Sequence, residues 1–111
     1  MVVAFFPSAM SARQTVAQQK LVKLHHLVGT VVDKRGFPVE YAVLELCDPS
    51  NHAVLASTFA DAQGRFSFAD RRRGTQLEIR ASQKGFNITT YEIVVREFGK
   101  SKLRVILTVA T

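Results

Sequence analysis

The sequence is poor in the residues that build disulfides and metal sites. Its 111 residues include one cysteine, no tryptophan and three histidines. A lone cysteine excludes an internal disulfide and any zinc cluster made of thiolates. The histidines, His25, His26 and His52, lack His-x-His or His-Glu-x-x-His spacing, and the adjacent His25 and His26 would face opposite sides of a strand. We therefore expect no metal and no cofactor.

Long apolar runs and glycine-rich phosphate loops are also absent. No apolar run approaches the ~20 residues that span a bilayer, so we do not expect a transmembrane segment. No glycine cluster precedes a helix that could receive a phosphate, which argues against nucleotide binding. No serine or cysteine has the sequence context of a catalytic nucleophile. Together these absences predict a protein that is not an enzyme.

The composition is that of a single globular domain with a basic surface. Hydrophobic residues make up 47% and charged residues 22%, and the formal net charge is +6. Such a charge favours acidic partners but does not choose among them. The basic residues are scattered except for the run Arg71-Arg72-Arg73, which is the candidate binding loop. A protein or glycan partner is expected; nucleic acid is not, because no aromatic residues interleave with the basic ones.

Hydrophobicity alternates with a period of two along most of the chain. Phe66 and Phe68 share one strand face, and Leu77, Ile79 and Ala81 share another. Turn residues separate these runs at short intervals. We predict about seven strands and an all-β, antiparallel Greek-key β-sandwich. The strands are expected near residues 26–33, 40–47, 53–60, 65–69, 75–83, 87–95 and 102–110.

One cysteine falls within this pattern. Cys47 follows the inward-facing Leu44 and Leu46 out of phase, so we expect it to face outward or to lie at the end of its strand. A plain thiol is the expected chemistry there, rather than a reactive one.

Three stretches carry a family likeness. They are GTVVDKRGFPVEYAVLEL (29–46), ADAQGRFSFADRRRGTQLEIRASQKGF (60–86) and LRVILTV (103–109). Together they resemble the carboxypeptidase regulatory-like domain, a transthyretin-like (prealbumin-like) β-sandwich module. Two features depart from the family pattern: Gln76 replaces an aromatic residue, and Arg71–Arg73 replace the usual Leu or Pro before Gly74.

The likeness implies a fold and a general role. The matching Asp33 and Asp61 can accept backbone N–H groups in the turns they open, and Gly36 and Gly64 allow those turns to close. Members of the family are generally non-catalytic and occur beside zinc carboxypeptidase domains, in bacterial surface proteins and in TonB-dependent outer-membrane transporters. The resemblance therefore implies a binding, spacing or stabilising module.

The first 24 residues differ from the rest. An apolar stretch over residues 2–6, followed by Pro7 and small residues, is typical of the later part of a secretory signal, although a basic start is lacking. Cleavage is expected after Ser11 or after Ala17. The alternatives are a short tail or a helix over residues 13–24. We divide the chain into an N-terminal extension (1–24) and a β-sandwich domain (25–111), periplasmic or extracellular if the extension is a signal and cytoplasmic if it is not.

Three functions follow from these observations, in order of preference. The first is a non-catalytic β-sandwich module of the cell envelope that contacts a protein or glycan or stabilises a larger assembly. The second is a binder of an anionic ligand, an acidic polysaccharide or nucleic acid, through Arg71, Arg72 and Arg73. The third is a transthyretin-like hydrolase. That enzyme fits poorly, because it ends in a Tyr-Arg-Gly-Ser signature and this chain ends in LTVAT.

Overall fold

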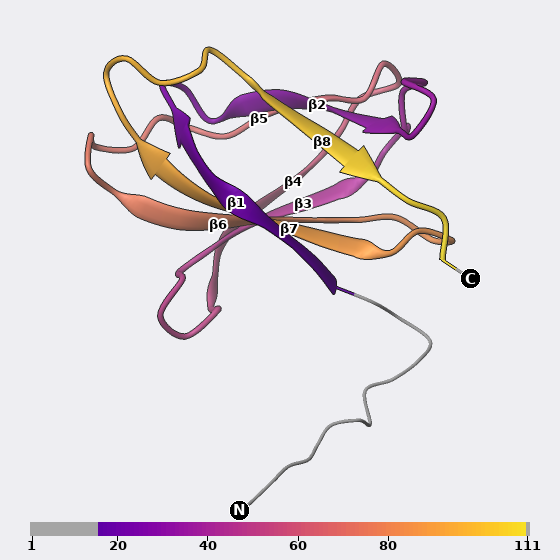
Figure 1. Ribbon diagram of the computed structural model, residues 1–111, viewed down its shortest axis with the longest axis horizontal. Helices are drawn as coiled ribbons and strands as arrows, with labels where there is room; N and C mark the ends of the chain where they lie inside the picture. Colours follow the sequence, from indigo (N-terminus) through magenta and orange to yellow (C-terminus); the bar gives the residue numbers. More distant parts are fainter. Residues whose placement is uncertain (1–15, 111) are drawn as a thin grey trace, which may run out of the picture.

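The computed structural model describes residues 16–110, which form eight strands. The strands are β1 (Val16–Leu24), β2 (Val28–Asp33), β3 (Val43–Cys47), β4 (Val54–Phe59), β5 (Arg65–Ser67), β6 (Gln76–Ser82), β7 (Ile88–Val95) and β8 (Leu103–Leu107). Figure 1 shows two stacked sheets, with β5, β2 and β8 above the others. The described residues contain no helix long and apolar enough to cross a membrane.

The strand order explains how the two layers form. The larger sheet has the order β1-β7-β6-β3-β4, and the smaller has the order β5-β2-β8. Strands β3, β4, β6 and β7 pair antiparallel, as does β5 with β2. The sandwich prediction is thus confirmed, and each of the seven expected strands is present. Two pairs are parallel, β1 with β7 and β2 with β8, because long connections place these strands side by side in the same direction.

The eighth strand comes from the segment assigned to the N-terminal extension. Residues 16–24 form β1, which lies along β7 from Ile88 to Val95. The helix considered for residues 13–24 is therefore wrong where the structure describes this segment. Strand pairing prevails because β7 offers a free edge, whose backbone hydrogen bonds outweigh weak helix propensity. Residues 1–15, with the predicted cleavage point after Ser11, lie outside the described residues, and Ala17 lies within β1.

The core lies between the sheets and contains the side chains expected to face inward. Phe66 is 5% exposed, and Phe68 packs against the same cluster, with its ring centroid 6.2 Å from that of Phe66. The largest fully buried side chains are Leu24, Leu27, Leu44, Leu46, Ile79, Ile93 and Leu107. Because both sheets supply these residues, their burial holds the two layers together.

The two aspartate turns form as the sequence predicts. Oδ1 of Asp33 accepts the backbone N–H groups of Arg35 and Phe37, at 2.9 and 3.0 Å. Oδ1 of Asp61 accepts those of Gln63 and Arg65, at 2.9 and 2.8 Å. Each turn then closes through a glycine with a positive φ, 91° at position 36 and 78° at position 64. The Asp33 turn therefore fixes the end of β2, and the Asp61 turn fixes the start of β5.

Candidate functional site

The three consecutive arginines lie in the loop between β5 and β6. The loop closes where the backbone N–H of Thr75 donates to the carbonyl of Arg72, over 3.1 Å. Nη1 of Arg73 lies 3.0 Å from Oε1 of Glu97 in the β7–β8 loop. Within residues 16–110, Arg71 and Arg72 have no ion-pair partner. Arg73 thus differs from its two neighbours, because its side chain forms an ion pair with a residue of a second loop.

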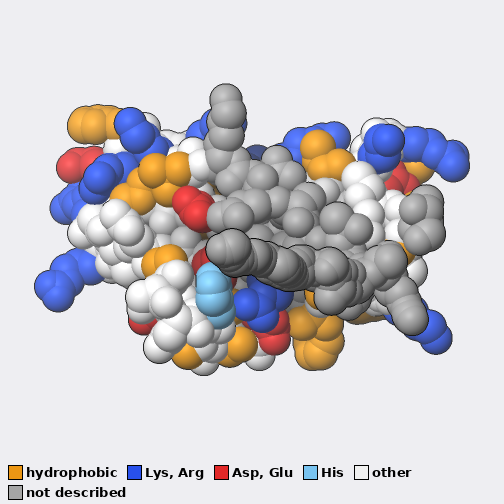
Figure 2. Space-filling model, turned by 60° about the horizontal axis from the view of Figure 1, so that its bottom comes forward, with side chains coloured by type: hydrophobic (Ala, Val, Ile, Leu, Met, Phe, Trp, Pro, Cys, Tyr) orange, Lys and Arg blue, Asp and Glu red, His pale blue; other side chains and the backbone are white. Residues whose placement is uncertain are grey.

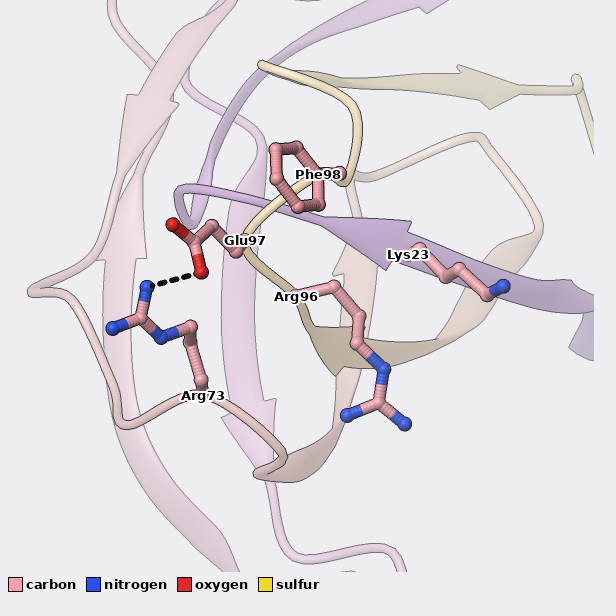
Figure 3. Close-up of a pocket in the computed structure, with 5 residues that line it drawn as sticks. All are labelled: Lys23, Arg73, Arg96, Glu97 and Phe98. Atoms are coloured by element: carbon pink, nitrogen blue, oxygen red, sulfur yellow. Dashed lines mark ion pairs between the residues drawn. The ribbon is translucent and has the colours of Figure 1, made fainter.

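Arg73 lines a basic hollow of about 440 Å³. The other lining residues are Lys23 at the end of β1 and Arg96, Glu97 and Phe98 in the β7–β8 loop (Figure 3). Three separate segments therefore contribute three cations, one carboxylate and one aromatic ring to the lining of the same hollow. Figure 3 shows Arg73 directed at Glu97, whereas the Arg96 side chain points away from that pair.

Phe98 is the most exposed large apolar residue of the described chain, at 94%. A second hollow of about 360 Å³ lies against the same ring and also includes Lys23. Its remaining lining residues are Leu21, Val22, Gly99 and Lys100. We call the two hollows together the Phe98 site. This site has four cationic side chains and one acidic side chain, that of Glu97, which is paired with Arg73.

The β7–β8 loop is held against the end of β1 by backbone hydrogen bonds. The N–H of Lys100 donates to the carbonyl of Lys23 over 2.9 Å, and that of His25 donates to the carbonyl of Lys100 over 2.8 Å. Closer to β7, the N–H of Arg96 donates to the carbonyl of Leu24 over 3.2 Å. The loop that carries Phe98 is therefore preorganised, although its side chain is exposed.

Gly99 permits this close contact. A Cβ atom at this position would lie 2.7 Å from the backbone nitrogen of Leu24 and 2.8 Å from the carbonyl carbon of Lys23. Both atoms belong to backbone that a hydrogen-bonded strand holds in place. Any larger residue would push the loop away from β1, and with it the ring of Phe98.

The ion pair inside the site is open to solvent. The side chains of Arg73 and Glu97 are 64% and 58% exposed. Solvent-exposed pairs of this kind contribute about 0–1 kcal/mol, because water screens the attraction and two long side chains lose freedom. A carboxylate on a ligand could replace Glu97 beside Arg73 at little cost.

Sequence reasoning found one member of this site. Arg73 was identified within the basic run, whereas Lys23, Arg96 and Lys100 were counted among the scattered basic residues. No pattern in the sequence indicates a role for the ring of Phe98. The missing information was the pairing of β1 with β7, which brings residue 23 beside residues 96–100.

A second polar group lies on the outer face of the larger sheet. The buried carboxylate of Glu78 lies 2.9 Å from Nδ1 of His52, and Arg80 lies 3.2 Å from Glu45. Figure 2 views this face, and a histidine there adjoins basic and acidic side chains. We call Glu45, Cys47, His52, Glu78 and Arg80 the outer-face cluster. Within this cluster, the acidic side chains of Glu78 and Glu45 are paired with His52 and Arg80.

Cys47 belongs to this cluster and is buried. It is the last residue of β3, as predicted, and opposes Glu78, so both side chains lie on the outer face. Burial raises the pKa of the Cys47 thiol, and the nearby Arg80 offsets this only in part. A thiol with a raised pKa is a poor nucleophile at neutral pH.

The other histidines have separate partners. His25 Nδ1 lies 3.3 Å from the carbonyl oxygen of Arg96, and His26 Nδ1 lies 3.2 Å from Oδ1 of Asp70. They follow β1 in a bend, so their rings meet edge to face, with centroids 4.2 Å apart. In the part of the chain that the structure describes, no group of three or more metal-ligating side chains could hold an ion.

The sequence relationship of this chain follows from a family comparison. A sequence profile of the carboxypeptidase regulatory-like domain matches residues 26–108. The chain belongs to this family. The match spans β2 to β8, and β1 precedes it. No curated protein matches this carboxypeptidase regulatory-like chain in sequence.

Several solved structures share the fold of this regulatory-like domain. The catechol 1,2-dioxygenase from Pseudomonas arvilla C-1 has a TM-score of 0.55 at 14% identity, covering 90% of this chain and 59% of that chain. The 3-chlorocatechol 1,2-dioxygenase from Rhodococcus opacus 1CP has a TM-score of 0.55 at 11% identity, covering 96% and 70%. The hydroxyquinol 1,2-dioxygenase from Pseudomonas putida DLL-E4 has a TM-score of 0.53 at 10% identity, covering 95% and 64%. Likeness at such identities concerns the fold alone.

Proposed function

We propose that this chain is a non-catalytic β-sandwich module of the cell envelope that binds an acidic protein segment at the Phe98 site. The carrying observation is that four cations and an almost fully exposed phenylalanine line two adjoining hollows. Lys23, Arg73, Arg96 and Lys100 line the two hollows together with one carboxylate, that of Glu97, which Arg73 already contacts. The excess positive charge attracts acidic groups, and the ring supplies an apolar anchor.

The two hollows favour a peptide that carries an apolar side chain between acidic residues. The hollow beside β1 is lined by the apolar Leu21 and Val22, with Lys23 and Lys100 at its margin. An apolar side chain would pack there against Phe98, while flanking carboxylates would reach the lysines and Arg96. Because the loop is already held against β1, binding would require little ordering of the protein.

Two observations support the absence of catalysis. The Cys47 thiol has a raised pKa, which opposes its use as a nucleophile. The charged groups of the outer-face cluster bind one another, as in the pairs of His52 with Glu78 and Arg80 with Glu45. The family is generally non-catalytic, which agrees with this proposal. The transthyretin-like hydrolase remains the least favoured function.

The envelope location rests on the amino terminus. The apolar residues 2–6, with Pro7 and the small residues after it, are typical of the later part of a secretory signal. Fractionation of cells that express the full chain with a C-terminal tag tests this directly. Recovery from the periplasm or medium, with a shortened N-terminus, supports the proposal; recovery of the uncleaved chain in the cytoplasm contradicts it.

An acidic polysaccharide is the second candidate ligand, and the exposure of Phe98 favours it. An aromatic ring that is 94% exposed can stack on the apolar face of a sugar, while the surrounding cations bind acidic groups. The neighbouring Arg71 and Arg72 would extend this basic surface along a long polymer. Nucleic acid is also anionic, but the Phe98 site offers one aromatic ring rather than the row of rings that stacks successive bases.

The test compares variants of the Phe98 site with a matched variant elsewhere. Binding of the full chain is measured at two salt concentrations to an acidic peptide of the type Asp-Glu-Leu-Glu-Asp, to heparin and to single-stranded DNA. The double variant K23A/R96A should weaken peptide binding about tenfold or more at low salt, whereas R35A/R104A, which removes two exposed arginines outside the site, should not. Equal losses in both variants would reduce the effect to net charge and contradict the site.

Substitution of Phe98 separates the two ligand classes. Phe98→Leu retains an apolar anchor but removes the aromatic face, so a peptide should bind nearly as well and a sugar should bind more weakly. Phe98→Ser removes both properties and should weaken both ligands. The variant R71A/R72A should weaken heparin binding more than peptide binding. Peptide binding that is unchanged in Phe98→Ser would overturn the proposal.

A further inference from the structure

Strand β4 lies at the edge of the larger sheet opposite β1. Among the described strands, it has β3 as its single neighbour in the sheet. An edge strand presents backbone N–H and C=O groups along its free side, and another strand can pair with them. Natural proteins usually protect such edges with charged residues, proline or a covering segment.

β4 lacks the usual chemical protection. Its six residues, VLASTF, include no charged residue and no proline. Val54, Leu55 and Phe59 are 50%, 47% and 67% exposed, so large apolar side chains accompany the free backbone edge. This combination is typical of a strand that pairs with a second chain rather than of one that faces water alone.

The sequence of β4 is complementary to itself in one register. Opposed residues of an antiparallel pair share a face, so a strand that pairs with its own copy can be centred on one residue. With Ser57 at the centre, Leu55 of each copy opposes Phe59 of the other, and Ala56 opposes Thr58. The exposed Leu55 of each copy then packs on the exposed Phe59 of the other. The symmetry forms this cross-strand contact twice, and it stabilises the pairing.

The charge distribution also favours a second copy at this edge. The cations of the Phe98 site lie at the opposite edge, around the end of β1. Beside β4, Arg65 Nε lies 3.0 Å from Oδ2 of Asp61, and on β3 Glu45 is paired with Arg80. Two copies that meet through β4 would therefore keep their basic sites far apart, despite the net charge of +6 on each.

We propose that β4 pairs antiparallel with β4 of a second copy of this chain, centred on Ser57. The contact is two-fold symmetric, since each copy contributes the same strand. It joins the larger sheets of the two copies into one continuous sheet. This inference is independent of the ligand that the Phe98 site binds.

The oligomeric state of the full chain is the first test. Sedimentation velocity over about a hundredfold range of protein concentration should show a monomer and dimer in equilibrium. Phe59→Lys should shift this equilibrium toward the monomer about tenfold or more, because it places an unpaired charge within the pair. Phe37→Lys, which changes another exposed phenylalanine, in the turn after β2, serves as the control and should leave the dimer unchanged.

A cross-link tests the register. In Ser57→Cys the two introduced thiols oppose each other, within reach of a disulfide after mild oxidation. Ser50→Cys in the exposed β3–β4 loop is the control, because that residue lies outside the paired strand. Cross-linking of the first variant and not the second supports the proposal. A monomer at every concentration, or a dimer that persists in Phe59→Lys, would overturn it.

Discussion

Nδ1 of His52 lies 2.9 Å from Oε1 of Glu78, although the two residues belong to different structural elements. Glu78 is a buried residue of β6, whereas His52 is an exposed residue of the β3–β4 loop with a positive φ of 61°. A buried carboxylate requires hydrogen-bond donors, because loss of its water is costly. The contact therefore anchors the loop to the sheet and explains why a non-glycine residue adopts this backbone conformation.

Removal of the imidazole should destabilise the fold. We expect His52→Ala to lower the free energy of unfolding by about 1–2 kcal/mol, since Glu78 loses its nearest donor. Urea unfolding followed by circular dichroism measures this change. His52→Asn, which tolerates a positive φ, controls for backbone strain. If His52→Ala has the same effect in a Glu78→Gln background as in the wild type, the two side chains are not coupled.

The Cys47 thiol should react slowly in the folded protein. Its side chain is buried, and burial raises its pKa, so little thiolate is present at neutral pH. A time course with an aromatic disulfide reagent should show slow labelling at neutral pH, faster labelling as the pH rises, and rapid labelling in urea. Labelling of the native protein as fast as of the unfolded chain would contradict the buried position.

Gly99→Ala should affect both stability and binding. The new Cβ atom would meet backbone atoms of Leu24 and Lys23, which we expect to cost about 1–3 kcal/mol. Because the loop must move, peptide binding at the Phe98 site should also weaken. Gly85→Ala is the control: its φ of 89° makes the substitution strained by about 1–2 kcal/mol, but nothing lies within 4 Å of its Cβ. Equal binding by the two variants would contradict the role of Gly99.

The Asp61 turn should make part of the stability depend on pH. A backbone hydrogen bond from Arg65, with others at the same carboxylate, lowers the pKa of Asp61 below its usual value. The ionised Asp61 carboxylate therefore contributes its full stability above the unfolded pKa of about 3.9. This stability is lost as the pH falls through the lower folded pKa. The stability difference between wild type and Asp61→Asn should be constant near neutral pH and should narrow in acid. A stability difference that widens in acid would contradict the lowered pKa of Asp61.

The fold was largely predictable because its signals are local. Alternation at Phe66 and Phe68 shows which face is buried, and the aspartate turns close within four residues. The parallel pairing of β1 with β7 was not predictable in this way. It joins residues about seventy positions apart, and the segment that forms β1 has no pattern that distinguishes a strand from a tail.

The candidate site was less predictable for the same reason. The run of three arginines is conspicuous in the sequence, yet only Arg73 reaches the Phe98 site. Lys23 and Phe98 come together through backbone hydrogen bonds between the end of β1 and the β7–β8 loop. The proximity of a single lysine and a single phenylalanine leaves no trace in composition or spacing. Only the pairing of the strands reveals it.

The position of β1 divides the Phe98 site between a segment that precedes the family match and a segment within it. The family profile begins at residue 26, whereas Leu21 and Lys23 precede it and Phe98 lies within it. The match thus includes the wall of the site that carries Phe98 and leaves out the wall that β1 supplies. A different leading strand on the same sandwich would therefore change one wall of this site and leave the scaffold of the other wall in place.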